Sequence, residues 1–147
     1  MKDKPMWIVI ADGGRGRVLK ANNAGRGIAP ALDHELVADT RPGREINADR
    51  PGRTKDRMAQ GRHAYEPPTD PRENEQIEFA RQIARLLDDE RKQGSYGRLA
   101  IIAPPKMLGL LREAMTGEVR DLVSAEIAKD LTKLPLHELE KRLPELL

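Results

Sequence analysis

The sequence predicts an α/β domain with a mixed sheet of about five strands, in the chain order βββαβαβα. Two short apolar stretches, 7–11 and 99–103, are typical of strands buried on both faces of a sheet. In the second half, helix-like and strand-like stretches alternate, which favours parallel strands joined by crossover helices. In the first half, an Asp-Gly pair between two apolar stretches predicts antiparallel partners instead.

The first half is expected to form three strands. Residues 7–11 form a central strand, and the Asp-Gly pair at 12–13 begins a tight hairpin turn. Residues 17–21 then return as the antiparallel partner. After a second turn at 22–29, apolar and polar residues alternate over 32–39, which predicts a third strand with one exposed face.

The second half is expected to alternate helices and strands. A start signature at 70–73, with an Asp as N-cap candidate and Pro at the first helical position, predicts a long helix that stops near Gly94. The elements expected after it are a strand at 99–103, a helix over 107–115 that Gly117 ends, a strand at 122–127 and a terminal helix at 136–146.

This order is the one found in ribonuclease-H-like folds, including the type seen in translation-machinery components. We expect residues 1–147 to form a single domain, a usual length for one hydrophobic core. The absence of cysteine excludes disulfides, a thiolate nucleophile and Cys-ligated zinc. The sequence has no stretch with the length and apolar character of a membrane span or a signal peptide, so we expect a cytoplasmic protein that does not bind membranes.

A long segment at 40–73, rich in Pro, Gly and Arg, separates the third expected strand from the first expected helix. Compact domains seldom keep more than about 12–15 residues without secondary structure unless those residues have a function or are disordered. Between Arg41 and Arg62 the segment holds seven basic and three acidic residues, whereas the whole chain has a net charge of only +2. A basic segment anchored at both ends suits the capture of phosphate backbones, and a solvated insertion is the alternative.

We therefore predict RNA or partner contacts from this segment and from the preceding hairpin. The candidate residues are Arg50, Arg53, Lys55, Arg57, Arg62, His63, Tyr65, Arg15 and Arg17. The glycine-rich turn at 13–17 is not expected to form a dinucleotide or P-loop cradle, because those cradles need a helix directly after the glycines and here a strand follows. A plain hairpin turn is the favoured interpretation, with a basic turn touching a polyanion as the alternative.

Four carboxylates could form the acidic cluster of a two-metal nuclease if they converged: Asp12, Asp39, Glu126 and Asp130. The first two suit a turn and a strand end better, and we expect no metal and no cofactor. The charged stretch with Glu126, Lys129 and Asp130 is most simply a set of solvated ion pairs. The histidines lack ligand spacing and the serines and threonines lack a paired histidine, so neither a zinc site nor Ser/His catalysis is predicted.

Several motifs, in the same order along the chain, resemble those of a known family. They are Trp7–Gly13, Arg50–Arg53, Gly61–Pro67 with Thr69–Pro71, Leu99–Pro105, Leu108–Arg112 and Glu126–Thr132. Together they resemble the bacterial family called "protein required for attachment to host cells", over about residues 7–143. That family is similar to the middle domain of bacterial relatives of archaeo-eukaryotic class 1 release factors, in which a loop between a strand and a long helix carries a Gly-Gly-Gln motif that assists hydrolysis of peptidyl-tRNA.

The resemblance implies that segment 40–73 takes the place of that loop and that the ribosome or tRNA is the partner. This chain has Gln60-Gly61-Arg62 in place of Gly-Gly-Gln, which argues against hydrolysis because Arg62 brings a cation where release factors bring an uncharged amide. We therefore expect a non-catalytic RNA-binding protein. Two alternatives stay open: a peptidyl-tRNA ester hydrolase in which Gln60, Arg62 and His63 position water, and a protein–protein adaptor that supports attachment.

Overall fold

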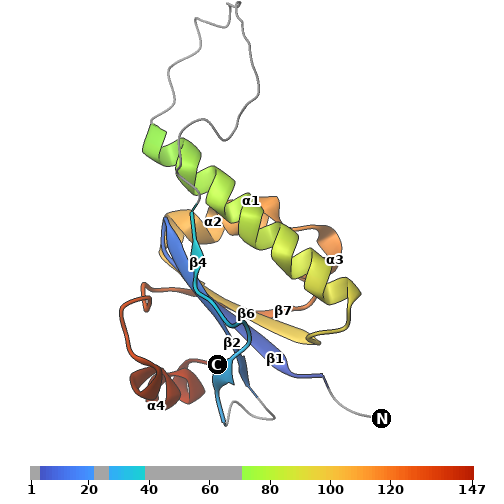
Figure 1. Cartoon of the computed structure of the whole chain (residues 1–147), viewed down its shortest axis with the longest axis vertical. Helices are drawn as coiled ribbons and strands as arrows, with labels where there is room; N and C mark the ends of the chain where they lie inside the picture. Colours follow the sequence, from blue (N-terminus) through green and yellow to red (C-terminus); the bar gives the residue numbers. More distant parts are fainter. Residues whose placement is uncertain (1–3, 22–26, 39–70) are drawn as a thin grey trace, which may run out of the picture.

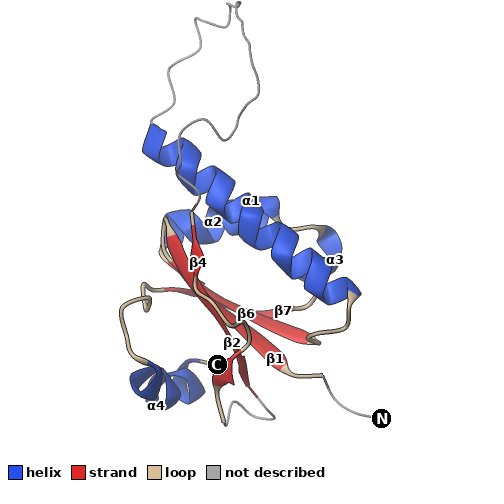
Figure 2. Cartoon of the chain, viewed as in Figure 1, coloured by secondary structure: helices blue, strands red, loops and turns tan. Residues whose placement is uncertain are grey.

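The computed structural model describes residues 4–21, 27–38 and 71–147. In these residues an open mixed sheet of six strands carries helices on both faces (Figures 1 and 2). Helices α1 (Pro71–Lys92), α2 (Pro105–Ala114) and α3 (Gly117–Asp121) cover one face, and α4 (Leu136–Leu146) covers the other. The α/β class with a mixed sheet is confirmed, with six strands rather than about five.

The central strand is β1 (Met6–Ala11), and all six of its residues are buried. It pairs antiparallel with β2 (Arg15–Ala21) and parallel with β6 (Arg98–Ala103). β6 in turn pairs parallel with β7 (Val123–Ala128), which is the outer strand on that side. The predicted buried strand, hairpin and parallel crossovers are therefore confirmed.

The prediction of one continuous third strand over 32–39 was wrong, although β4 lies within this range. Two separate two-residue strands, β3 (Ala29–Pro30) and β4 (Leu36–Val37), each pair with β2, and residues 31–34 bend between them. Pro30 has no N–H to donate, so the ladder cannot simply continue through it. The expected turn at 22–29 also ends early, because Ala29 already belongs to β3. Residues 22–26 of that turn and Asp39 lie outside the described part of the chain.

Helix α1 has the apolar face that its sequence predicts. Its buried residues are Phe79, Ala80, Ile83, Ala84 and Leu87. The helix stops at Gly94 as expected, because Gly94 has φ of 78° and its N–H donates to the Arg91 carbonyl at 3.0 Å, while Ser95 N–H donates to the Glu90 carbonyl at 3.0 Å. This is the Schellman arrangement, in which a left-handed glycine satisfies the last carbonyls of a helix. The expected N-cap, Asp70, is not among the described residues.

Gly117 does not act as the helix breaker that the sequence predicted. Helix α2 already ends at Ala114, because Met115 is extended with ψ of 144°, and Gly117 begins the short helix α3. The Thr116 hydroxyl caps α3 by accepting a hydrogen bond from Val119 N–H at 3.2 Å. This extra helix and the divided third strand are the two departures from the predicted order, whereas the bounds of α4 agree with the prediction.

The sheet separates two apolar cores. On the α1 side, Trp7 stacks on Tyr96 with ring centroids 5.1 Å apart, and the Tyr96 hydroxyl donates to the Leu87 carbonyl at 2.6 Å. On the α4 side, Leu139 and Leu143 pack with alternate residues of β1 and β6. Alternation of side chains along each strand thus supplies both cores from the same strands.

Candidate functional site

The turn between β1 and β2 is organised by Asp12. Its Oδ1 accepts hydrogen bonds from Gly14 N–H at 2.9 Å and from Arg15 N–H at 2.8 Å, and its own N–H donates to the Arg15 carbonyl at 2.9 Å. Such side-chain bonds to the following backbone are the reason Asp favours tight turns. Asp12 therefore shapes the hairpin turn, and the turn presents the exposed Arg15.

The described chain comes close to this turn both before and after the segment 39–70, at Ala38 and at Gln76 of α1. Ala38 N–H donates to the Gly14 carbonyl at 2.8 Å, which fixes the chain before the segment. The chain after the segment enters α1, and the side chain of Gln76 lies so near Gly13 that a Cβ there would be 2.8 Å from Gln76 Nε2. Figure 1 shows the start of α1 and the end of β4 at the same end of the molecule.

The exposed cations at this end are paired with carboxylates. Arg15 Nη2 lies 3.5 Å from Glu35 Oε1, and the Arg15 side chain is 65% exposed. Lys106 Nζ, at the start of α2, lies 3.4 Å from Glu73 Oε2 in the first turn of α1 and is 57% exposed. Exposed pairs of this kind contribute about 0–1 kcal/mol, so another anion can replace the carboxylate at small cost.

Arg17 has a different environment from Arg15. Its Nη1 donates to the Leu134 carbonyl at 2.6 Å, which joins β2 to the segment that leads into α4. A groove of about 390 Å³ opens beside it, lined by Arg17, Val18, Leu19, Pro30, Leu32, Asp33, His34, Glu35 and Thr132. The two arginines predicted together as binding residues thus differ, because Arg15 faces solvent and Arg17 holds a backbone carbonyl.

Two of the predicted carboxylates approach the same hydroxyl group. Thr132 Oγ1 lies 2.6 Å from Asp130 Oδ1 and 3.3 Å from Asp12 Oδ2. One hydroxyl proton can serve one of these acceptors at a time, and the shorter contact is to Asp130. Two hydrogen bonds hold the pKa of Asp130 below its ordinary value. The bond from the Thr132 hydroxyl has the larger effect, and the bond from Thr132 N–H has the next largest.

Among the residues that the structure describes, the remaining candidates do not complete an acidic cluster. Glu126 forms an ion pair with Arg112 of α2, and Lys129 is exposed at the end of β7. Within residues 4–21, 27–38 and 71–147, no three His, Asp or Glu side chains gather closely enough to hold a metal ion. The exposed cations Arg15 and Lys106 each lie beside one exposed carboxylate at this end of the sheet.

Most of the predicted RNA-binding residues fall in the part of the chain that the structure does not describe. They are Arg50, Arg53, Lys55, Arg57, Arg62, His63 and Tyr65, and Gln60 of the hydrolytic alternative lies there too. Their roles stay predictions. Lys106 was missed by the sequence analysis, although its position after Pro104-Pro105 at the start of a helix was a signal that could have drawn attention to it.

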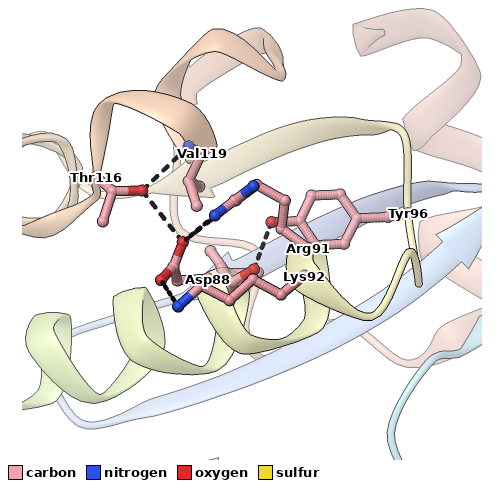
Figure 3. A network of polar contacts seen from close by, with 7 residues as sticks. Asp88, Arg91, Lys92, Tyr96, Thr116 and Val119 are labelled. Carbon is pink, nitrogen blue, oxygen red and sulfur yellow. Dashed lines mark hydrogen bonds and ion pairs between the residues drawn. The ribbon is translucent and has the colours of Figure 1, made fainter.

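A polar network between α1 and α3 was also missed (Figure 3). Asp88 Oδ1 accepts from Arg91 Nη2 at 3.0 Å and from Thr116 Oγ1 at 3.4 Å, and Asp88 Oδ2 lies 3.3 Å from Lys92 Nζ. The hydrogen bond from Arg91 is the main cause of a lowered Asp88 pKa. The i, i+3 and i, i+4 spacing of these charges was visible in the sequence, whereas the link to Thr116 was not.

The family of this chain follows from its similarity to known proteins. The profile of the family described as "Protein required for attachment to host cells" matches residues 7–143. The chain belongs to this family. The chain is also similar to an uncharacterized protein of Rickettsia prowazekii (strain Madrid E), with 39% identity over 71 residues. The match covers 47% of each chain, so it spans about half the length of that relative.

The family description names a contact with host cells and no chemistry. None of the helices in the described part of the chain is both long enough and apolar enough to cross a membrane. The biochemical activity has therefore to be inferred from the end of the sheet that carries Arg15 and Lys106.

Proposed function

We propose that this member of the host attachment family is a non-catalytic, cytoplasmic RNA-binding protein whose target is the ribosome or tRNA. We further propose that it is related to the release-factor middle domain and shares its ribonuclease-H-like fold type. The basic residues of segment 40–73 would supply most of the contacts. The observation that supports this best is that Ala38, just before the segment, and Gln76, in the second turn of α1 after it, both lie against the turn that presents Arg15.

The charges at this end of the sheet suit a phosphate backbone. Arg15 and Lys106 are exposed and belong to the turn and to the start of α2, next to the point where the basic segment leaves and returns. Each is paired with one exposed carboxylate, and phosphate oxygens can take the place of that carboxylate. RNA held there would contact the turn and the arginines of the segment together.

The sequence of the segment supports binding rather than hydrolysis. Gln60-Gly61-Arg62 replaces the Gly-Gly-Gln of release factors, and a guanidinium binds phosphate through a planar fork of N–H donors. An uncharged amide positions water without attracting an anion. The substitution therefore favours an RNA contact over water activation.

The test is co-sedimentation of the purified protein with ribosomes over a salt series, and fluorescence anisotropy with labelled tRNA. The binding variant carries Arg50→Glu, Arg53→Glu and Arg62→Glu. The matched control carries the same number of reversals, Arg120→Glu, Lys141→Glu and Arg142→Glu, at exposed positions of α3 and α4. Thermal unfolding of both variants checks that they fold.

Binding by the native chain is expected to weaken steeply with salt, because each phosphate contact releases a counterion. Loss of three contacts should reduce the slope of log K against log salt by about 2–3 in the binding variant, while the control keeps the native slope at a similar net charge. Equal losses in both variants would show that overall charge alone governs binding and would refute the proposal. Release of a labelled peptide from stalled ribosomes would favour the hydrolase alternative instead.

A further inference from the structure

The side chain of Gln76 lies against the turn between β1 and β2 without a hydrogen-bond partner in the described part of the chain. It is half-buried, and no atom within residues 4–21, 27–38 and 71–147 forms a hydrogen bond with its amide. Gln82, farther along the same helix, instead donates to the Val37 carbonyl at 3.3 Å. A side-chain amide has two N–H donors and a carbonyl acceptor, and polar groups removed from water are normally hydrogen-bonded. The Gln76 amide is therefore available to a ligand.

Gly13 leaves the space in which this amide lies. A Cβ at position 13 would lie 2.8 Å from Gln76 Nε2 and 3.3 Å from Gln76 Cδ, closer than a Cβ normally approaches other atoms. The backbone of Gly13 does not have positive φ, so its conformation is open to other residues. The close approach of the amide therefore accounts for the glycine, and it places the Gln76 side chain beside the turn.

The amide lies near both exposed cations of this end of the sheet. Arg15 is two residues after Gly13 in the same turn, and its side chain is exposed. Lys106 Nζ lies 3.4 Å from Glu73 Oε2, and Glu73 is three positions before Gln76, on the same side of α1. Two groups that can bind phosphates thus lie near one uncharged group that has both donors and an acceptor.

This combination of cations and an uncharged amide suits single-stranded RNA. Cations bind phosphates whatever the sequence, whereas a side-chain amide can form two hydrogen bonds with the edge of an unpaired base. Adenine presents a donor beside an acceptor on both its Watson–Crick and its Hoogsteen edge, whereas the other three bases present such a pair on the Watson–Crick edge alone. Adenine is therefore the base that a glutamine amide can bind in the most orientations.

We propose that Gln76 selects adenine in single-stranded RNA whose phosphates bind Arg15 and Lys106. This inference rests on the proposed RNA-binding function and adds to it the base that is preferred. The residues involved belong to the turn, to α1 and to α2, so the preference is separate from the contacts proposed for the arginines of segment 40–73.

Fluorescence anisotropy tests this with labelled single-stranded RNA oligonucleotides of equal length, made of adenine, cytosine or uracil alone. Gln76→Met replaces the amide by an unbranched apolar side chain that α-helices accept about equally well. The matched control is Gln93→Met, the same exchange at an exposed glutamine just beyond the C-terminal end of α1. Gly13→Ala is a second variant, because its Cβ would displace the Gln76 amide without removing it. Thermal unfolding of all variants checks that they fold.

The native chain and Gln93→Met are expected to bind the adenine oligonucleotide about 5- to 150-fold more tightly than the uracil oligonucleotide, which is the discrimination that a two-bond contact to a base supplies. Gln76→Met should bind both with similar affinity. Its slope of log K against log salt should equal that of the native chain, because no phosphate contact is lost. Gly13→Ala should lose part of the preference.

A native chain that does not prefer adenine, or a preference that persists in Gln76→Met, would overturn the inference. An unchanged preference in Gly13→Ala would contradict the placement of the amide. If the native chain bound no oligonucleotide but still co-sedimented with ribosomes, the inference would fail and the proposed function would stand. Absence of both kinds of binding would overturn the proposed function as well.

Discussion

Removal of the Thr116 hydroxyl should destabilise the protein by loosening α3. In Thr116→Ala, Val119 N–H loses its acceptor at 3.2 Å, and Asp88 loses a donor at 3.4 Å. Replacing a Ser or Thr N-cap by Ala costs about 0.5–2 kcal/mol, and the long contact to Asp88 adds little to that. We expect the free energy of unfolding to fall by about 1 kcal/mol.

Urea unfolding followed by far-UV circular dichroism measures this effect. For a urea m-value of about 2 kcal/mol/M, a loss of 1 kcal/mol lowers the midpoint by about 0.5 M. Thr116→Ser is the matched control, because it keeps the hydroxyl and removes only a methyl group. A midpoint for Thr116→Ala equal to that of the native chain would refute the capping role, and so would an equal loss in Thr116→Ser.

Three further predictions concern α1 and the residues at its C-terminal end. The hydrogen bond from Arg91 is the main cause of the lowered Asp88 pKa, so the ionised Asp88 stabilises the fold above the unfolded-state pKa of 3.8 and this contribution is lost as pH falls through the folded-state pKa. In urea titrations, the stability difference between the native chain and Asp88→Asn should therefore shrink below about pH 4. A difference that does not depend on pH would contradict this. Gly94→Ala should cost about 1–2 kcal/mol because φ is 78°, whereas Gly94→Asn should cost less; equal losses would argue against a left-handed cap. Tyr96→Phe keeps the stacking on Trp7 but loses the bond to Leu87, so it should cost about 1 kcal/mol. Burial raises the Tyr96 pKa to about 12, so of the ultraviolet titration of the chain's two tyrosines the step near pH 12 should disappear in this variant.

Elements whose signals are local were predictable from the sequence. The five apolar residues of 7–11 predicted a central buried strand, and the helical spacing from Phe79 to Leu87 predicted the buried face of α1. Gly94 predicted the end of that helix, because glycine adopts positive φ at little cost. In each case a few neighbouring residues determine the conformation.

The errors arose where the signal was short or ambiguous. Helix α3 has five residues, too few to show a helical period, and a glycine predicts the end of a helix more often than its start. The alternation over 32–39 looked like one strand, but Pro30 and the bend after it divide this edge into two pieces. Alternation reports which side chains face the core and not whether the backbone pairs continuously.

Contacts at the candidate site could not be predicted because they join distant parts of the chain. The bond from Arg17 to Leu134 spans 117 positions, and that from Thr132 to Asp12 spans 120. The sequence identified Arg15, Arg17, Asp12 and Asp130 as candidates but could not show that Arg15 faces solvent while the others are engaged with the backbone or with one another. The functional roles of the basic residues in segment 40–73 stay predictions.

The unequal cover on the two faces of the sheet has a consequence for how the protein opens. The long helix α1 contributes five buried residues to its core, whereas α4 contributes two, Leu139 and Leu143, with Leu136 and Leu146 half-buried beside them. The two fully buried leucines contribute about 3–6 kcal/mol, comparable to or below the stability of a whole domain. The α4 helix should therefore detach from the sheet while β1, β6 and α1 remain folded, so its amides would exchange with solvent hydrogen sooner than those of the central strands. The hydrogen bond from Arg17 to the Leu134 carbonyl, just before α4, would have to break for the helix to detach.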